Sequence, residues 1–254
     1  MTDPDFEPLW TTLDGQPVRA RRVTVAPAAP RPTVVLLPGL GLSGDYLLGL
    51  ARCLGPRLPT VVVDLPGSGG CPGPAIPLRP AHLAEVVVRW LDANALSSVV
   101  LFDNSFGSQV AAEVAIKRPD LVRALVLGAP TPDATARSFW IHVYRLLRAA
   151  VIAPGWLTRL ALRDYRRTGF RPLLREGLNA LHEPVRDRLG QVSVPTHIVR
   201  GDRDPVVSQQ WAEEVAGLVG APLSVVRGAG HGAPAAAPRQ VAPIILSAAA
   251  AAAE

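Results

Sequence analysis

The stretch SVVLFDNSFGSQVAAEVAIK, residues 98–117, decides the fold. Its first part is a run of β-branched and large apolar residues, which is typical of a buried strand. Its last part, from Gly107 onward, has apolar residues at spacings of three and four, which predicts a helix. Ser105 lies in the short polar turn between the two. We therefore expect Ser105 to stand at the end of a strand in an α/β protein.

Similar apolar runs recur along the chain and alternate with helical patterns. The expected strands are residues 22–26, 33–38, 60–64, 98–104, 121–128, 196–201 and 223–228, and the expected helices between them are residues 78–94, 106–117 and 207–219. This alternation predicts a doubly wound, mostly parallel sheet with helices on both faces.

The alternation fails between residues 131 and 191, where helical patterns begin near Ala134, Gly155 and Phe170 with no strand between them. We interpret residues 131–191 as a helical lid on a core formed by residues 1–130 and 192–254. Apolar side chains at helical spacing in this lid are the candidate lining of a substrate pocket: Phe139, Trp140, Val143, Leu146, Leu147 and Trp156. The same spacing also suits the core of the lid itself.

Composition and charge limit the class of protein. The chain has 254 residues, of which 48% are hydrophobic and 19% charged, so it is globular and not disordered. The net charge of +5 is local, because residues 137–175 contain nine arginines and one acid, Asp164, a balance of +8. No nucleic-acid motif accompanies this patch. We therefore expect a solvated arginine face and no nucleic-acid partner.

The ends of the chain and its cysteines bear on location. The first ten residues are acidic, unlike a signal peptide, and the uncharged run 241–253 is too short for a membrane span and contains Pro243. Cys53 and Cys71 form neither a disulfide framework nor a zinc-binding pattern. These features predict a cytoplasmic protein with two free thiols, no stable membrane association and no metal.

Three residues in a particular order indicate nucleophilic chemistry. A serine hydroxyl becomes an effective nucleophile when a histidine accepts its proton and a carboxylate orients that histidine. After Ser105, Asp204 follows one expected strand and His231 follows the next. The carboxyl ends of parallel strands meet at one edge of a sheet, so the three residues are expected together there. Asp202 and Asp133 are the alternative carboxylates.

Asp103 departs from the usual pattern around such a serine. Small residues are needed two positions to either side of the nucleophile, and Gly107 meets that need where Asp103 does not. A larger residue there either widens the turn or is held by a hydrogen bond that offsets the crowding. Asp103 is then either tolerated strain or a carboxylate that organises the site, for example by orienting a neighbouring arginine. We favour tolerance, because a second negative charge would oppose charge development in the site. The remaining histidines are interpreted as surface or core residues: His82, His142, His182 and His197.

With these residues in place, the chain resembles the α/β-hydrolase family from Pro38-Gly39 to Gly230-His231, with the family's order of serine, acid and histidine. The resemblance implies that Ser105 is the nucleophile, Asp204 the acid and His231 the base.

The resemblance also implies an oxyanion hole made by the backbone amides of Leu40 and Phe106, and no metal or organic cofactor. The chain is similar to esterases, lactonases and carbon–carbon bond hydrolases of this superfamily. The expected activity is that of a serine hydrolase that cleaves a carboxylic ester, or a related acyl bond, in a small and partly apolar substrate through an acyl-enzyme at Ser105.

Two other functions remain open at this point. Gly39, Gly41 and Gly44 form a G-x-G-x-x-G pattern after a strand, and Asp64 ends the next strand, as in an NAD(P)-dependent Rossmann oxidoreductase. That interpretation leaves Ser105, Asp204 and His231 unexplained. The second alternative is a catalytically silent protein that binds a small ligand under the same lid, since a fold does not by itself establish activity.

Overall fold

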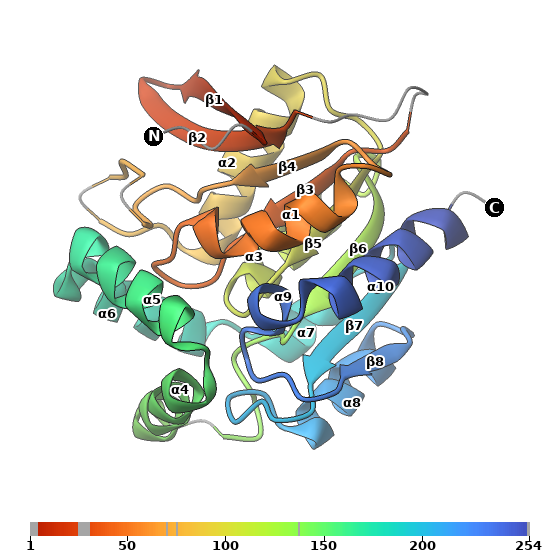
Figure 1. The fold of residues 1–254 in the computed structure, drawn as a ribbon. Coiled ribbons are helices and arrows are strands. Elements are labelled where there is room, and N and C mark those ends of the chain that lie inside the picture. Colours follow the sequence, from red (N-terminus) through yellow and green to blue (C-terminus); the bar gives the residue numbers. More distant parts are fainter. Residues whose placement is uncertain (1–4, 25–30, 70, 75, 137, 253–254) are drawn as a thin grey trace.

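The computed structural model describes residues 5–24, 31–69, 71–74, 76–136 and 138–252. Its centre is an eight-stranded sheet in the order β1-β2-β4-β3-β5-β6-β7-β8 (Figure 1). The strands are β1 (Phe6–Leu13), β2 (Gln16–Val23), β3 (Val34–Leu37), β4 (Thr60–Val63), β5 (Val99–Asp103), β6 (Val122–Gly128), β7 (Thr196–Gly201) and β8 (Leu223–Val226). Every neighbouring pair from β4 to β8 is parallel. The doubly wound, mostly parallel sheet expected from the sequence is confirmed.

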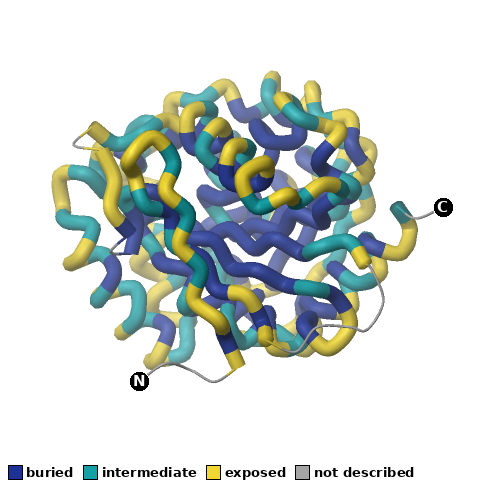
Figure 2. The backbone as a smooth tube through the Cα atoms, turned by 90° about the horizontal axis from the view of Figure 1, so that it is seen from above, coloured by how far each residue is buried: buried dark blue, intermediate teal, exposed yellow. Residues whose placement is uncertain are grey.

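The parallel strands are buried on both faces, and the dark central strands in Figure 2 show this burial. Along β3, Val35 and Leu37 belong to the apolar cluster on one face, and Val34 and Leu36 belong to the cluster on the other. All four are 0% exposed. A strand covered on both sides needs an unbroken apolar run, which is the pattern that the sequence presents.

Two sets of helices cover the two faces. The first set is α2 (Pro80–Ala93), α3 (Gly107–Lys117) and α8 (Gln209–Leu218). The second set is the 3-10 turn η1 (Gly44–Leu47) with α1 (Leu48–Leu54), α9 (Ala233–Ala236) and α10 (Pro238–Ala251). Trp90 and Trp211 are the largest side chains of the first cluster and are fully buried. The helices thus cover both faces of the sheet, and those between parallel strands provide the crossover connections that parallel pairing requires.

The first two strands form an antiparallel hairpin that the sequence analysis did not identify. Asp14 and Gly15 join them, with φ values of 49° and 78°. A two-residue hairpin turn needs two such left-handed residues, and Asp-Gly is a strong sequence signal for it. The extent predicted for the strand at residues 22–26 was wrong, because β2 ends at Val23. Residues 25–26 lie outside the described residues.

Four helices lie between β6 and β7, with no strand among the residues described there: α4 (Phe139–Ile152), α5 (Gly155–Thr168), α6 (Phe170–His182) and α7 (Val185–Leu189). We refer to α4–α7 as the helical insertion. α5 and α6 begin where the sequence predicts. α4 begins at Phe139 and not near Ala134, because the Asp133 carboxylate accepts hydrogen bonds from the amide and hydroxyl of Thr135 and holds this segment as a turn.

Two further observations concern the helices and the cysteines. Across the described ranges, no helix combines the length and the apolar character needed to cross a membrane. Cys53 and Cys71 are both free thiols, as expected.

A buried ion-pair network ties the hairpin to the parallel sheet. Asp64, directly after β4, is 0% exposed and accepts hydrogen bonds from Arg19 at 2.5 Å, from Arg21 at 2.7 Å and from the amide of Gly44 at 2.6 Å. Arg21 also donates to Asp45 at 2.6 Å. A buried charge is tolerated only when it is paired in this way. Asp64 therefore fixes β2 and the start of η1 relative to β4.

We expect Asp64→Asn to lower the free energy of unfolding by about 3 kcal/mol, because two partly buried guanidinium groups lose their anionic partner. Urea denaturation measures the change. Asp14→Asn is the matched control, because Asp14 pairs with Arg89 at the surface with 78% of its side chain exposed, and such pairs contribute about 0–1 kcal/mol. Equal losses in the two variants would contradict the structural role assigned to Asp64.

Candidate active site

Ser105 lies in a sharp turn between β5 and α3. Its φ is 61°, in the left-handed region that residues other than glycine rarely adopt. Its backbone amide donates to the carbonyl of Gly128 at 2.7 Å. Gly107 makes the tight turn possible, because a Cβ there would lie 2.8 Å from the carbonyl oxygen of Pro38. The turn is the strained strand-to-helix geometry that presents a serine hydroxyl at the carboxyl edge of a sheet.

The structure brings Ser105, His231 and Asp204 together from three separate loops. His231 Nε2 lies 2.8 Å from Ser105 Oγ, and His231 Nδ1 lies 2.9 Å from Asp204 Oδ2. The side chain of Asp204 is 0% exposed and that of His231 is 12% exposed. In this arrangement a histidine can accept the serine proton while the carboxylate fixes the orientation and tautomer of the ring.

The loop after β7 holds Asp204 in position. Asp204 Oδ1 accepts hydrogen bonds from the amides of Val206 at 2.7 Å and Val207 at 3.2 Å, which leaves Oδ2 for His231. Arg200, a buried residue of β7, donates to the carbonyls of Val207 at 2.8 Å and Asp204 at 3.1 Å. Sequence analysis missed Arg200. The sequence did offer a signal, because Arg200 is a charged residue within a predicted strand, and charged residues are rarely buried there without a partner.

The two alternative carboxylates have other environments. Asp202 is exposed. The Asp133 carboxylate accepts hydrogen bonds from Arg145 at 2.8 Å and from the amide of Ser208 at 3.0 Å, in addition to those from Thr135. Burial alone would raise the pKa of Asp133, but these hydrogen bonds outweigh burial and lower the pKa to about 2. Asp133 therefore anchors α4 through Arg145, and of the three aspartates Asp204 is the one hydrogen-bonded to His231.

The loop that contains Leu40 lies directly against the Ser105 turn. A Cβ on Gly39 would be 3.3 Å from both Asn104 O and Ser105 Cβ, and the Gly39 amide donates to the buried hydroxyl of Tyr46 at 2.9 Å. Within the described residues, the amides of Leu40 and Phe106 donate to no protein group. Both amides therefore remain free to donate to an oxygen atom of a ligand.

Asp103 is held in place under the Ser105 turn. It is 0% exposed, and Oδ1 accepts hydrogen bonds from Ser108 Oγ at 2.5 Å and from the Gly128 amide at 3.3 Å. Burial raises the pKa of Asp103 well above its ordinary range, against the effect of these two hydrogen bonds. Burial therefore shifts the protonation equilibrium of Asp103 toward the neutral carboxyl, relative to an exposed aspartate. The crowding expected from the sequence is offset by hydrogen bonds that join β5 to α3 and β6.

We expect Asp103→Asn to keep kcat within about threefold, because the amide keeps the shape of the carboxyl and the oxygen that accepts the hydrogen bonds from Ser108 and Gly128. Asp103→Gly removes both hydrogen bonds and should lower the free energy of unfolding by about 1–3 kcal/mol, while kcat falls less than about tenfold. Ester turnover and urea denaturation measure the two effects. A fall of about tenfold in kcat for Asp103→Asn, equivalent to about 1.4 kcal/mol, would assign a role in the reaction to the ionised carboxylate.

The helical insertion packs against the loop that carries His231. Ile152 Cγ2, at the end of α4, lies 3.1 Å from the position that a Cβ of Gly230 would take. Leu157 Cδ2, in α5, lies 2.6 Å from the corresponding position of Gly232. These two apolar side chains flank the loop of His231 on both sides. The insertion therefore borders the site.

A second contact fixes the insertion to the loop between β3 and η1. The carboxylate of Asp164, in α5, accepts hydrogen bonds from the amide of Ser43 at 2.9 Å and from its hydroxyl at 2.6 Å. Arg163 pairs with Asp45 at 2.6 Å and with Asp164 at 2.8 Å. Because Asp45 also binds Arg21, a continuous chain of charges connects the hairpin, this loop and α5.

The apolar residues expected to line a substrate pocket differ in exposure in the structure. Trp140 and Leu147 are 74% and 63% exposed, and Trp156 is 48% exposed. Side chains this exposed do not line an enclosed pocket, so that expectation does not fit them. Phe139 and Val143 are partly buried and remain candidates.

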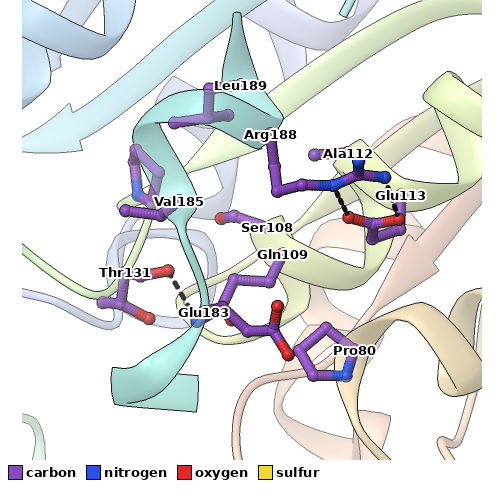
Figure 3. A pocket seen from close by; sticks show the side chains of 11 residues that line it. Pro80, Ser108, Gln109, Ala112, Glu113, Thr131, Glu183, Val185, Arg188 and Leu189 are labelled. Carbon is purple, nitrogen blue, oxygen red and sulfur yellow. Dashed lines mark hydrogen bonds and ion pairs between the residues drawn. The ribbon is translucent and has the colours of Figure 1, made fainter. Parts of the chain in front are cut away.

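Two cavities lie elsewhere in the molecule. The first, of about 10 Å³, lies beside the Arg188–Glu113 ion pair and the hydrogen bond from Gln109 to Thr131 (Figure 3). Its volume suits about one water molecule. The second, of about 430 Å³, is lined by residues 132–134, Ala136, His142 and residues 181–187. Neither cavity has Ser105, Asp204 or His231 in its lining.

Glu176 is a buried carboxyl that sequence analysis missed. It lies in α6, is 5% exposed, and has no hydrogen bond or ion pair among the described residues. Its neighbours in α6 pack on the candidate oxyanion loop, since Leu173 Cδ1 would be 2.6 Å from a Cβ of Gly41. Burial raises the pKa of Glu176 to about 7. The sequence carried a signal for this residue, because Glu176 is the one acid of the predicted helix and lies on its apolar side.

This carboxyl gives a pH-dependent prediction. The folded protein keeps the Glu176 proton up to about pH 7, whereas the unfolded chain releases it near pH 4.5, so stability falls as the pH rises through this interval. Glu176→Gln removes the free-energy cost of ionising this buried carboxyl, because glutamine carries no charge at any pH. We expect it to leave stability unchanged at pH 4 and to raise the free energy of unfolding by about 3 kcal/mol at pH 8. Denaturation curves at several pH values test this, with the exposed Glu7→Gln as control. A gain that does not depend on pH would contradict it.

The geometry of Asp64 argues against the dinucleotide alternative. Its carboxylate is fully buried and already accepts hydrogen bonds from Arg19, Arg21 and the amide of Gly44. A dinucleotide site needs this acid to accept a hydrogen bond from a ribose hydroxyl. We therefore interpret the glycine-rich segment as the loop that lies against the Ser105 turn and not as a dinucleotide site.

The other histidines have local environments of their own. His82 is exposed, and His182 Nδ1 lies 2.6 Å from the carbonyl of Leu178. His197 Nε2 lies 2.8 Å from Ser224 Oγ, and burial lowers the pKa of His197. His142 is buried in α4, which also lowers its pKa. Of the histidines, His231 is the one hydrogen-bonded to Ser105.

The fold and this geometry define a doubly wound α/β protein with a serine, histidine and aspartate at the carboxyl edge of its sheet. The profile of the alpha/beta hydrolase family matches residues 34–244, which is most of the chain. The chain belongs to the alpha/beta hydrolase family.

Individual relatives are more distant. The chain is similar to a 1-acylglycerol-3-phosphate O-acyltransferase of Arabidopsis thaliana, at 30% identity over 134 residues, and to a pimeloyl-[acyl-carrier protein] methyl ester esterase of Chromobacterium violaceum, at 33% identity over 111 residues. The matches cover 49% and 44% of this chain, and 32% and 42% of the relatives. The chain thus spans less than half the length of these curated relatives.

Among solved structures, a membrane phospholipase A described as a bacterial virulence factor has a TM-score of 0.82 and 22% identity, over 98% of this chain and 87% of the other. Identity at this level establishes the fold alone.

Proposed function

We propose that this protein is a serine hydrolase that cleaves a carboxylic ester through an acyl-enzyme at Ser105. The observation that carries the proposal is the position of the His231 ring, which lies 2.8 Å from Ser105 Oγ on one side and 2.9 Å from Asp204 Oδ2 on the other. Nucleophile, base and orienting acid within hydrogen-bonding distance are the requirement for activating a serine.

The reaction follows from these positions. Ser105 Oγ attacks the ester carbonyl carbon while its proton passes to His231 Nε2, and the amides of Leu40 and Phe106 donate to the oxygen that becomes negative. The carbon–oxygen bond to the leaving group then breaks, and His231 gives its proton to the departing alkoxide. Water next attacks the acyl-enzyme, with His231 as the base. The products are a carboxylic acid, an alcohol and free Ser105.

The substrate class is inferred from the surroundings of the site. Ile152 and Leu157 border the loop of His231, which favours a substrate with an apolar part. We infer that the helical insertion acts as the lid expected from the sequence, over a core formed by residues 1–130 and 192–254. The names of the two curated relatives, an esterase and an acyltransferase, support acyl chemistry. The same three residues also suit the hydrolysis of lactones and of carbon–carbon bonds.

A catalytically silent ligand-binding protein is the alternative that labelling tests. A fluorophosphonate probe reacts with an activated serine and not with an ordinary hydroxyl. We expect one labelled peptide, which carries Ser105, and no labelling in His231→Ala. Absence of label on the folded protein would favour the silent alternative.

Substitutions at the three residues give a quantitative test of the proposal. Ser105→Ala and His231→Ala should each lower kcat for a soluble ester by about 10⁶-fold, and the double variant should be no worse, because the two residues act as a unit. Asp204→Asn should cost about 10⁴-fold. Turnover of p-nitrophenyl acetate at fixed pH measures these effects. Asp202→Asn is the matched control, and a larger loss in it than in Asp204→Asn would show that the acid is misassigned.

A further inference from the structure

Helix α4 presents a row of large apolar side chains to solvent. Trp140, Tyr144, Leu147 and Val151 are 74%, 60%, 63% and 86% exposed. Their spacings of four, three and four residues place them on one face of the helix, within an arc of about 60°. We call these four residues the α4 stripe.

Two polar residues of α4, His142 and Arg145, face the opposite way. His142 is buried, and Arg145 reaches inward to Asp133 at 2.8 Å and to the carbonyl of Val206 at 3.1 Å. A surface helix normally buries its apolar face and exposes its polar face. α4 is inverted, so the packing of the monomer does not account for the stripe. Figure 1 shows α4 at the lower left, on the outside of the molecule and away from the sheet.

The helices α4–α6, which lie within the described residues, carry exposed arginines and no exposed acid. In residues 139–182 the acids are Asp164 and Glu176, which are 0% and 5% exposed. The exposed arginines of the same helices make no ion pair with a carboxylate among the described residues: Arg148, Arg159, Arg166, Arg167, Arg171 and Arg175. Arg148 lies over the ring of Tyr144, 6.0 Å from its centre, and so joins the charged surface to the stripe.

We propose that the α4 stripe docks the protein on an anionic lipid surface. A helix that lies in the membrane interface inserts aromatic and aliphatic side chains among the acyl chains and sets cationic groups at the level of the headgroups. Tryptophan and tyrosine suit that boundary, because each has an apolar ring and a polar atom. Each arginine near such a surface adds electrostatic attraction to the anionic headgroups. This docking is peripheral and needs no membrane-spanning helix.

Charge and shape favour lipid over two other occupants. A second copy of this chain on the same face would place two arginine-rich surfaces against each other, since a symmetric dimer pairs identical patches. An acidic protein would meet the charge, but four protruding side chains on one convex helix need a partner surface with matching pockets. A fluid acyl layer accommodates them without such pockets.

The proposed surface adjoins the candidate active site. α4 ends at Ile152, which packs on Gly230 next to His231. A protein docked through the stripe would therefore hold the site close to lipid. The docking itself does not depend on Ser105, so its test and the test of the hydrolase proposal can fail separately.

The test is sedimentation with vesicles of equimolar phosphatidylcholine and phosphatidylglycerol, compared with pure phosphatidylcholine. We expect binding to the anionic vesicles only, weakened by added salt. Tyr144→Glu combined with Val151→Glu should weaken binding at least about tenfold, because two inserted side chains become charged. Trp10→Glu is the matched control: Trp10 is a 56% exposed tryptophan of β1, and its variant should bind within about twofold of the wild type.

A second measurement does not depend on the charged variants. Brominated lipid in the anionic vesicles should quench tryptophan emission, and Trp140→Phe should remove more of this quenching than Trp10→Phe. Thermal unfolding and p-nitrophenyl acetate turnover of the Tyr144→Glu/Val151→Glu variant should match the wild type.

Three results would overturn the proposal. The first is failure of the wild type to bind anionic vesicles. The second is binding that the double variant leaves unchanged, which would reduce the interaction to charge alone. The third is a concentration-dependent dimer, detected by sedimentation velocity and abolished by the double variant, in a protein that does not bind vesicles.

Discussion

The left-handed backbone of Ser105 is the constraint on which the site depends. β5 ends at Asp103 and α3 begins at Gly107, so the chain turns from strand to helix within three residues. The turn is held on one side by the hydrogen bond from the Ser105 amide to Gly128 and from below by Asp103. Such strain persists only where the surroundings determine the backbone completely. The central position of β5, between β3 and β6, provides those surroundings.

The rest of the site reaches Ser105 through the order of the strands. β7 and β8 continue the sheet beyond β6, so the loops after them open at the same edge as the Ser105 turn. His231 and Ser105 are 126 positions apart in sequence and yet share a hydrogen bond. Arg200 and the amides of Val206 and Val207 then fix the acid. The side chains of the candidate site are thus oriented by backbone groups or buried side chains, and such preorganisation would reduce the reorganisation needed in the proposed reaction.

The arginines of the helical insertion fall into two groups, one turned inward and paired with aspartates and one exposed at the surface. Arg145 and Arg163 turn inward and pair with buried or partly buried aspartates. The ion pair of Arg163 with Asp45 and the hydrogen bond of Arg145 to the carbonyl of Val206 attach the insertion to the core. The other arginines of α4–α6 remain at the surface, and Arg148 lies over the ring of Tyr144 among the exposed apolar residues of α4. The inward arginines therefore have a structural role, and the exposed arginines are available for an interaction with another molecule. A solvated arginine face, as expected from the sequence, describes the second group, and the apolar residues within it point to lipid.

The local patterns of the sequence were enough to predict the parallel sheet, the place of the insertion, and Ser105 and His231 as site candidates, because buried strands and turn residues leave recognisable patterns. The hairpin of β1 and β2 was missed, although Asp14-Gly15 signalled it, since its alternation is weak beside the buried runs. Only the tertiary structure decided that Asp204 and not Asp202 meets His231, that Asp64 is occupied by arginines, and that the apolar face of α4 points outward. Helical periodicity shows that residues share a face but not which way the face turns, because that depends on contacts with distant segments.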